Sequence, residues 1–397
     1  MSYLSNFKFE EDEMTFDINN LNHSLLNALR RLIITDIETI AFRTEYGRES
    51  DIKVIKNTSS LHNEFLTHRI SLVPIHYNTK EIESFDPERY EFYIDVTNNS
   101  SKSLDVTTEH IKIKDLSKSP PVELSKDACA KFFPPNKLTG DFILLNRLKP
   151  NKYGNLEEGE TIQITMKADK SVGKEHSRYN PVCVSVFSNK RDEDKIKQEL
   201  EKRLKDKDLS LEAQGGKKMS DEEKQEFINS FMVSDADRFY HTDSQGEPNS
   251  FEFTIESDGR IAPHLIFDKS LFILEKRINL FMKKIEDDID LTIEKSDTIM
   301  PSYDFIFNNE DYTLAYLYQN YIYQLFQNVE KPTVKYVGCN IPHPLEDKMV
   351  IRIGLENITL NSDNIKNIFS ETSEYIKKII NSLKKEMKAN KSFVLDR

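Results

Sequence analysis

Two stretches of the sequence, one near each end, share the same local pattern. The first, at residues 16–31, reads FDINNLNHSLLNALRR, and the second, at residues 305–320, reads FIFNNEDYTLAYLYQN. Each has a phenylalanine and a further apolar residue before Asn-Asn, and each continues through Ser or Thr and Leu into apolar positions at helical spacing. The pattern predicts a strand, a turn and an amphipathic helix at both ends of the chain.

Similar elements follow each copy of this pattern. Strand-like segments come next, and a long helix with a narrow apolar seam closes the series, near Leu271 in the first copy and near Ile365 in the second. Because each short helix is apolar over a wider face than one sheet can cover, two related units can bury the remainder against each other. We therefore expect an α+β fold in which two units form an intrachain pseudo-dimer; chance likeness between amphipathic helices is the alternative. The residues predicted to form the pseudo-dimer interface are Leu25, Leu29, Leu32, Ile33, Leu274, Ile278, Phe281, Leu314, Leu317, Tyr321, Ile376 and Ile380.

Local signals place the helix boundaries. Asn22 or Ser24 is positioned to cap the first helix, and Asp311 or Thr313 to cap its counterpart. A third helix is predicted in residues 57–75. Its inward-facing residues are expected to be Leu61, Phe65, Leu66 and Ile70.

Shifts in pattern divide the rest of the chain. Residues 76–158 alternate over short segments interrupted by Asn, Ser and Pro, which is typical of small strands. Residues 189–226 interleave both charge signs, which indicates a solvated helical excursion rather than a binding tail. The expected organisation is a first dimerisation unit in residues 1–56 and 159–288, a mainly β insert domain in residues 57–158, a charged excursion in residues 189–235, a linker in residues 289–300 and a second dimerisation unit in residues 301–397.

Composition and charge exclude several classes of protein. The chain of 397 residues has a formal net charge of −12, so a chain-wide grip on nucleic-acid phosphates is not expected. Its cysteines, Cys129, Cys183 and Cys339, are far apart, which fits reduced thiols better than a disulfide framework or a zinc knot. No secretory signal or membrane-spanning segment is recognisable. We expect a soluble intracellular protein.

Sequence motifs for catalysis are missing. We find no GxxxxGK[ST] phosphate loop, no GxSxG nucleophile elbow and no aspartate triad of the kind that holds polymerase magnesium. His62 and Glu64 form an HNE triplet, but the zinc deaminase pattern also needs a downstream P-C-x-x-C, which the sequence lacks. A metal-dependent hydrolase is therefore the weakest alternative.

Longer motifs in the first three quarters of the chain resemble those of a known family. NALRRLIITDIETIAF at residues 27–42, followed by NTSSLHNEFLTHRISLVPI, resembles the assembly signature of alpha-like RNA polymerase subunits. VGKEHSRYNPVCVSV at residues 172–186 and FEFTIESDGRIAPHLIFDKSLFILEKRI at residues 251–278 are similar to later segments of the third-largest subunit of eukaryotic-type polymerases. The first dimerisation unit therefore resembles that subunit.

The last quarter of the chain is similar to a different subunit of the same family. NEDYTLAYLYQNYI at residues 309–322 and VGCNIPHPLEDKMVIRI at residues 337–353 are similar to the eleventh, smaller alpha-like subunit. Two subunits thus appear fused in one chain. Within that family such fusions are associated with large DNA viruses, so the resemblance implies a role in viral transcription.

The resemblance implies a non-catalytic assembly platform of a DNA-directed RNA polymerase. In this family two alpha-like units pair, and the pair nucleates assembly of the two large subunits that form the catalytic cleft. The implied partners are the largest and second-largest subunits and small subunits of the tenth and twelfth type, with DNA and RNA reached only through the complex and no membrane. The implied location is the virion and the host-cell cytoplasm, with the nucleus as the alternative. An architectural adaptor of similar fold in another complex is the other alternative for the function.

Individual residues carry over from the family motifs. Contact with a large subunit is implied for Asn27, Arg30, Arg31, Arg69, Glu175 and His176, and a role at a helix entry or turn for Asp311, Thr313, His343 and Pro344. One departure concerns metal. Many third-type subunits carry a cysteine cluster in the insert domain, but residues 76–128 contain no cysteine, so we expect no zinc, iron–sulfur or other cofactor.

Overall fold

The computed structural model describes residues 2–44, 50–79, 81–151, 159–213, 217–296, 301–343, 345–355 and 362–389. Helices and strands are mixed throughout them, which confirms the predicted α+β class. None of the helices in this described part combines the length and apolar character that a bilayer span requires. The chain divides into two compact units: unit 1 consists of Met1–Leu32, Val184–Glu256 and Pro263–Arg397, and unit 2 of Ile33–Cys183 and Ser257–Ala262.

The first sheet of unit 1 contains the first copy of the repeat. In β2, residues alternate between the core and the outside, and Phe16 is fully buried. Its ring stacks on Phe253 of the neighbouring strand, with 5.6 Å between ring centroids. The order of hydrogen-bonded strands is β1 (Leu4–Glu10), β2 (Glu13–Asn19), β13 (Ser250–Ser257) and β12 (Val182–Asn189).

The second sheet of unit 1 contains the second copy and repeats this arrangement. Strand β15 carries the buried Phe305 and Phe307, and it lies second in its sheet, as β2 does in the first. The strand order is β14 (Leu291–Ser296), β15 (Ser302–Asn308), β17 (Lys348–Leu355) and β16 (Val334–Asn340). Strand β14 lies in the range predicted as a linker. Its residues form a strand there because they pair antiparallel with β15. The two copies are therefore repeated in topology as well as in sequence.

The Asn-Asn pair has the same backbone conformation in both copies. The second asparagine is left-handed each time, with φ of 57° at Asn20 and 59° at Asn309. Asparagine adopts this region more readily than most other residues that have a side chain. The repeated Asn-Asn pair therefore forms the same tight turn in both copies, and this turn leads the chain from strand to helix.

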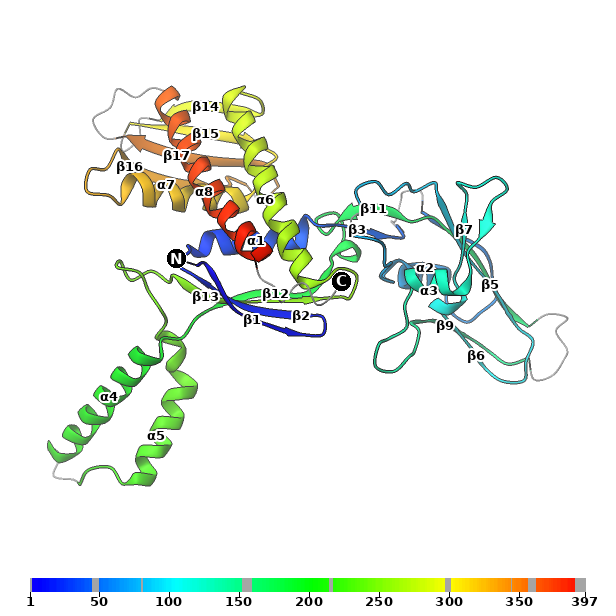
Figure 1. Ribbon diagram of the computed structural model, residues 1–397, viewed down its shortest axis with the longest axis horizontal. Coiled ribbons are helices and arrows are strands. Elements are labelled where there is room, and N and C mark those ends of the chain that lie inside the picture. Colours follow the sequence, from blue (N-terminus) through cyan, green and yellow to red (C-terminus); the bar gives the residue numbers. More distant parts are fainter. Residues whose placement is uncertain are drawn as a thin grey trace. The chain divides into compact units, whose positions relative to one another are not determined.

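Four helices lie between the two sheets of unit 1 (Figure 1). The short helices follow the Asn-Asn turns, and the two long helices contact each other. On α1, Leu25, Leu29 and Leu32 are buried, as the helical spacing predicts. The helices are α1 (His23–Thr35), α6 (Pro263–Glu286), α7 (Tyr312–Ile322) and α8 (Ser362–Ala389).

A helical hairpin connects β12 and β13 in the charged excursion. It consists of α4 (Glu193–Ala213) and α5 (Asp221–Ser234), and a capping box of Ser220 and Glu223 starts α5. Only a small apolar cluster, centred on Ile196 and Phe231, joins the base of the hairpin. Most of its other side chains are exposed, as the interleaved charges indicate.

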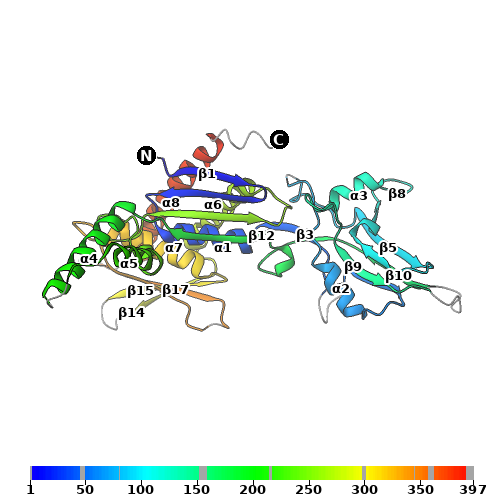
Figure 2. The same cartoon turned by 90° about the horizontal axis from the view of Figure 1, so that it is seen from below.

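Unit 2 is mainly β, with two short helices beside its strands (Figure 2). Phe65 on α2 is 69% exposed, so the prediction that it faces inward is wrong: α2 packs through Leu66 and Ile70, which lie on its other side. The five-stranded sheet has the order β4 (Ile52–Asn57), β10 (Glu160–Met166), β5 (Tyr90–Asn98), β7 (Lys112–Asp115) and β8 (Val122–Glu123). Unit 2 also contains the pairs β3 (Glu38–Ala41) with β11 (Asp169–Val172) and β6 (Leu104–Thr107) with β9 (Leu144–Leu148), the helices α2 (Asn63–Ser71) and α3 (Lys126–Phe132), and two 3-10 turns, Thr108–His110 and Ser177–Tyr179.

Candidate assembly interface

Unit 1 consists of a first half, with β1, β2, β12, β13, α1 and α6, and a second half, with β14 to β17, α7 and α8. The two halves share an aromatic core. Phe281 belongs to α6, in the first half, but its ring lies among aromatic rings of the second half. Its centroid is 4.5 Å from that of Phe307, 4.7 Å from that of Tyr318 and 6.2 Å from that of Phe369. Phe281 is fully buried. The long helix of the first half therefore completes the core of the second half.

A polar cluster surrounds this aromatic core at the start of α7. Arg277 Nη2 lies 3.2 Å from Glu310 Oε2 and 3.7 Å from Asp311 Oδ1. Lys284 lies further along α6. Its Nζ is 2.9 Å from Glu310 Oε1 and donates to the carbonyl oxygen of Asn308 at 3.1 Å. Two cations of the first half thus bind the acidic turn of the second half.

Asp311 also begins α7. Its side chain accepts a hydrogen bond from the backbone N–H of Thr313 at 2.8 Å, so of the two capping candidates it is Asp311 that caps. Burial by itself would raise the pKa of Asp311, but the hydrogen bonds from Thr313 and the positive charge of Arg277 outweigh it and lower that pKa. The ionised form of Asp311 is therefore favoured in the folded chain.

The basic pair on α1 divides between two roles. Arg31 Nε donates to Thr313 Oγ1 at 2.9 Å, which links α1 to α7. Arg30 Nε donates to Asn27 Oδ1 at 3.0 Å, and this is the only hydrogen bond or ion pair of the Arg30 side chain within the described residues. Burial and the neighbouring charge of Arg31 lower the pKa of Arg30. Arg30 is therefore a half-buried cation without an acidic partner in that part of the chain.

The end of α8 binds the first sheet in return. Glu386 accepts backbone N–H groups of Tyr3 at 2.9 Å and Leu4 at 2.8 Å, at the start of β1. Lys384 of α8 forms an ion pair with Glu275 of α6. Each long helix thus contacts the other half of unit 1.

Every residue predicted for the pseudo-dimer interface is buried. None is more than 2% exposed, although the part that each plays in pairing stays a prediction. These residues are Leu25, Leu29, Leu32, Ile33, Leu274, Ile278, Phe281, Leu314, Leu317, Tyr321, Ile376 and Ile380.

The remaining predicted contact residues lie in unit 2. Arg69 is exposed on α2 and donates from Nε and Nη2 to the carbonyl oxygen of Leu144 at 3.1 and 2.9 Å. The exposed Glu175 accepts a hydrogen bond from Ser171, and His176 is half-buried. Asn27 and Arg30, two of the other predicted contact residues, belong to unit 1.

Two buried arginines, Arg178 and Arg260, are not revealed by any pattern in the sequence. The Arg178 guanidinium donates to Nδ1 of His176 at 3.1 Å and to the carbonyl oxygens of Phe42 at 2.9 Å and Thr44 at 3.2 Å. Arg260 pairs with Asp258 and donates to the carbonyl oxygen of Asn180 at 2.6 Å. They link segments of unit 2, and because Arg178 lies in a single 3-10 turn (Ser177–Tyr179) and Arg260 in a loop, no spacing signal in the sequence reveals them.

The predicted turn residues of the second half are only partly described. His343 is exposed, and its Nδ1 accepts the backbone N–H of Leu345 at 3.1 Å. Pro344 lies outside the described residues. Across the part of the chain that the structure describes, no three His, Cys, Asp or Glu side chains are grouped closely enough to hold a metal ion.

Comparison with known proteins assigns both copies to one domain type. A family model described as "RNA polymerase Rpb3/Rpb11 dimerisation domain" matches residues 15–278, and a second model of the same description matches residues 302–386. The two matched ranges contain the two copies of the repeat. They confirm the predicted resemblance to alpha-like subunits and the presence of two such units in one chain.

Individual relatives carry RNA polymerase names. The chain is 24% identical over 194 residues to "DNA-directed RNA polymerases I and III subunit rpac1" of Dictyostelium discoideum, covering 44% of this chain and 49% of that protein. It is 20% identical over 333 residues to "DNA-directed RNA polymerases II, IV and V subunit 3" of Arabidopsis thaliana, covering 73% and 92%.

A third relative has a name of another kind. The "Conjugation stage-specific protein" of Tetrahymena thermophila is 29% identical over 201 residues, covering 45% of this chain and 56% of that protein. The chain therefore spans about half the length of this relative and of the Dictyostelium one.

Proposed function

Since the chain belongs to the RNA polymerase Rpb3/Rpb11 dimerisation domain family, we propose that it is the assembly platform of a multisubunit DNA-directed RNA polymerase. In this role its two alpha-like halves pair within one chain and together nucleate assembly of the largest and second-largest subunits. The chain itself performs no catalysis and needs no cofactor. The enzyme that it helps to build is a nucleotidyltransferase.

The observation that carries this proposal is the position of Phe281. A side chain of the first half fills the aromatic core of the second, and it is fully buried there. Fusion replaces association between two chains with an intramolecular step, which raises the effective concentration of each half for the other and fixes a one-to-one ratio. Such a chain suits a platform on which two different large subunits assemble.

Arg30 is the leading candidate for contact with a large subunit. Its guanidinium is half-buried and has one neutral hydrogen-bond partner among the described residues, Asn27. A guanidinium can form two parallel hydrogen bonds to a carboxylate or bridge backbone carbonyl oxygens. Arg31 is proposed to contribute to the same contact, although its Nε already binds Thr313 within the chain.

Further partners follow from the same proposal. Small subunits of the tenth and twelfth type would join the platform, and nucleic acid would be reached only through the assembled enzyme. The fusion of two units favours a viral transcription complex, present in the virion and the host-cell cytoplasm. Arg69, Glu175 and His176 are proposed as a second contact surface for these partners, on unit 2.

Co-purification from the native source tests the proposal. A tag on the full chain should recover the two large polymerase subunits in equal amounts, identified by mass spectrometry. Washing at raised salt separates specific assembly from loose charge contacts, because salt screens exposed charges. Recovery of a stable complex that lacks both large subunits would instead support an adaptor in another assembly.

A further inference from the structure

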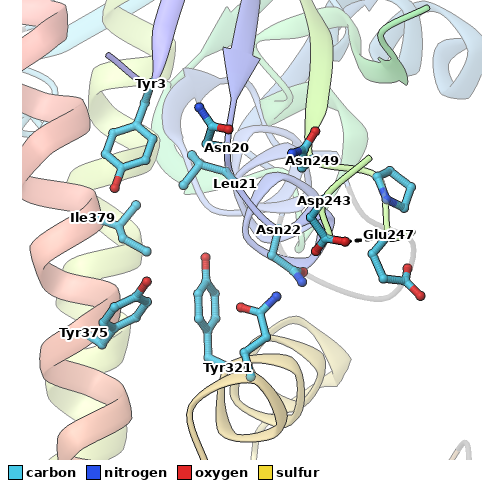
Figure 3. A pocket seen from close by; sticks show the side chains of 12 residues that line it. Tyr3, Asn20, Leu21, Asn22, Asp243, Glu247, Asn249, Tyr321, Tyr375 and Ile379 are labelled. Atoms are coloured by element: carbon cyan, nitrogen blue, oxygen red, sulfur yellow. Dashed lines mark hydrogen bonds between the residues drawn. The ribbon is translucent and has the colours of Figure 1, made fainter. Parts of the chain in front are cut away.

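A cavity of about 220 Å³ lies where the two halves of unit 1 meet. The first half contributes Tyr3 and Asn20, the second contributes Tyr321 and Tyr375, and the loop that follows α5 contributes carboxylates. Figure 3 shows the three phenol rings on one side of the space and Asp243 and Glu247 on the other. The cavity is therefore polar and acidic on one side and aromatic on the other.

The hydroxyl group of Tyr321 points into this space without a partner. Its side chain is 2% exposed, and its oxygen forms no hydrogen bond with the described residues. Figure 3 shows the hydroxyl directed toward Leu21, into the space between Ile379 and Asn22. Burial, with smaller effects of Tyr375 and Tyr3, raises the pKa of Tyr321, so the group stays a neutral hydroxyl that can accept a hydrogen bond. A buried hydroxyl without a partner is unfavourable, and a bound donor would satisfy it.

Negative charge at the cavity is also unmatched. The carboxylate of Glu247 is exposed and pairs with no side chain in the described part of the molecule. Asp243 Oδ1 accepts hydrogen bonds from the backbone N–H groups of Gln245 at 2.9 Å and Glu247 at 3.0 Å. These neutral donors do not cancel the negative charge of the carboxylate. The lining residues, all of them described, include no lysine, arginine or histidine.

The other half of the pseudo-dimer shows what an occupied site of this kind contains. At the second Asn-Asn turn, α6 places Arg277 3.2 Å from Glu310, beside Asn309. At the first turn, beside Asn20, α8 offers Tyr375 and Ile379 instead. The related turn therefore has a guanidinium from the chain itself, and this one has acids and hydroxyls without a cation.

We propose that the cavity binds a guanidinium group, carried either by an arginine side chain of a peptide or by a free alkylguanidine such as agmatine. The cation donates hydrogen bonds to the Tyr321 hydroxyl oxygen and to the Glu247 carboxylate. The rings of Tyr3 and Tyr375 attract it through their π-systems and cover its alkyl stem. Binding at this cavity does not depend on polymerase assembly.

Isothermal titration calorimetry on the full chain at low ionic strength tests the proposal with three probes. These are agmatine, N-acetyl-arginine-N-methylamide and the neutral analogue N-acetyl-citrulline-N-methylamide. The two cations should bind with Kd of about 1 mM or tighter, and citrulline at least about tenfold more weakly. Tighter binding of the arginine amide assigns the site to peptides, and tighter binding of agmatine assigns it to free alkylguanidines.

Variants locate the site. Tyr321→Phe keeps the ring and should weaken the cations about tenfold, with thermal unfolding unchanged or raised because the unpartnered hydroxyl is gone. Glu247→Gln should weaken them about threefold, and Glu226→Gln, an exposed acid on α5, should have no effect. Equal binding of citrulline, no binding of either cation, or unchanged affinity in Tyr321→Phe would overturn the proposal.

Discussion

The two Asn-Asn turns of unit 1 have the same backbone and different neighbours. Asn20 and Asn309 share a left-handed conformation, and each leads from the second strand of a sheet into a buried helix. Around the second turn, Arg277 and Lys284 of α6 bind Glu310. Around the first turn no such clamp forms among the described residues. The pseudo-twofold therefore repeats the backbone, whereas the side chains around the two turns differ.

Outer positions on the short helices differ in the same way. When the two copies are written one above the other, Arg30 is opposite Gln319. Arg30 is a half-buried cation, whereas Gln319 accepts the backbone N–H of Cys339 at 3.2 Å within its own half. Within the described residues Arg30 therefore has no acidic partner, whereas Gln319 is bonded inside its own half. Two unlike surfaces suit two unlike large partners.

Removing the shared aromatic residue should have the largest effect. Phe281→Ala leaves a cavity among Phe307, Tyr318 and Phe369, and a loss of about 3–5 kcal/mol in unfolding free energy is expected. Phe272→Ala on the same helix, where the ring is 56% exposed, should cost under about 1 kcal/mol. Urea denaturation measures both. Similar losses in the two variants would mean that the halves do not depend on Phe281.

Breaking the clamp of the second turn should come next. Arg277→Ala leaves Glu310 with Lys284 alone, and a loss of roughly 2 kcal/mol is expected. The exposed neighbour Lys276→Ala should stay within about 0.5 kcal/mol of the wild type. Thermal denaturation of the two variants and the wild type measures the difference. Equal stability of Arg277→Ala and Lys276→Ala would show that the ion pair between Arg277 and Glu310 does not stabilise the fold.

Exchanging the outer residues should change assembly without changing stability. Arg30→Gln gives the first helix the residue type of the second, and capture of the large subunits should weaken about tenfold or more, since a charge-assisted bond is lost. Unfolding should be unaffected. Lys202→Ala on α4 is an exposed control. Unchanged co-purification of Arg30→Gln after a salt wash would remove Arg30 from the contact surface.

The two turns should respond equally to backbone substitutions. Both asparagines are exposed, so alanine at either position mainly adds left-handed strain, and a loss of about 1 kcal/mol is expected for Asn20→Ala and for Asn309→Ala. Glycine at either position should cost almost nothing, because it adopts the conformation freely. Unequal alanine effects in denaturant titrations would break the equivalence of the turns.

The smallest expected effect concerns pH. Because the pKa of Asp311 is lower in the folded chain than the ordinary aspartate value of 3.8, Asp311 stabilises the fold above that value, and this contribution is lost as pH falls through the folded pKa. Asp311→Asn keeps a cap but not the charge. Between about pH 5 and about pH 3 the variant should lose less stability than the wild type, by under about 1 kcal/mol. Parallel pH profiles would argue against ionic stabilisation at this turn.

The sequence was sufficient to predict the repeated frame because periodicity reports which side of an element is buried. Leu29 and Leu317 were both placed inside, and both are fully or almost fully buried. Periodicity does not report which partner covers a side chain. The hydrogen bond from Arg31 to Thr313, from the other end of the chain, is therefore a contact that the pattern does not predict, while contact of Arg31 with a large subunit stays a prediction.

Local signals also failed where tertiary pairing decides the outcome. Strand β14 is too short and polar to be recognised as a strand from the sequence. Its pairing with β15 stabilises it as an edge strand. Arg178 lies in a short 3-10 turn and Arg260 in a loop, where no spacing rule connects an arginine with the carbonyl oxygens that it binds. Phe65 was assigned to the core of unit 2 from helical spacing, but α2 is a short surface helix with room for only two buried apolar residues.

The most direct test of the account is the subunit ratio of the assembled complex. Native mass spectrometry of the complex purified through this chain should find one copy of the chain with one copy of each of the two largest polymerase subunits, because the chain supplies both halves of the dimer. Two copies of the chain per complex, or a complex without the large subunits, would contradict it.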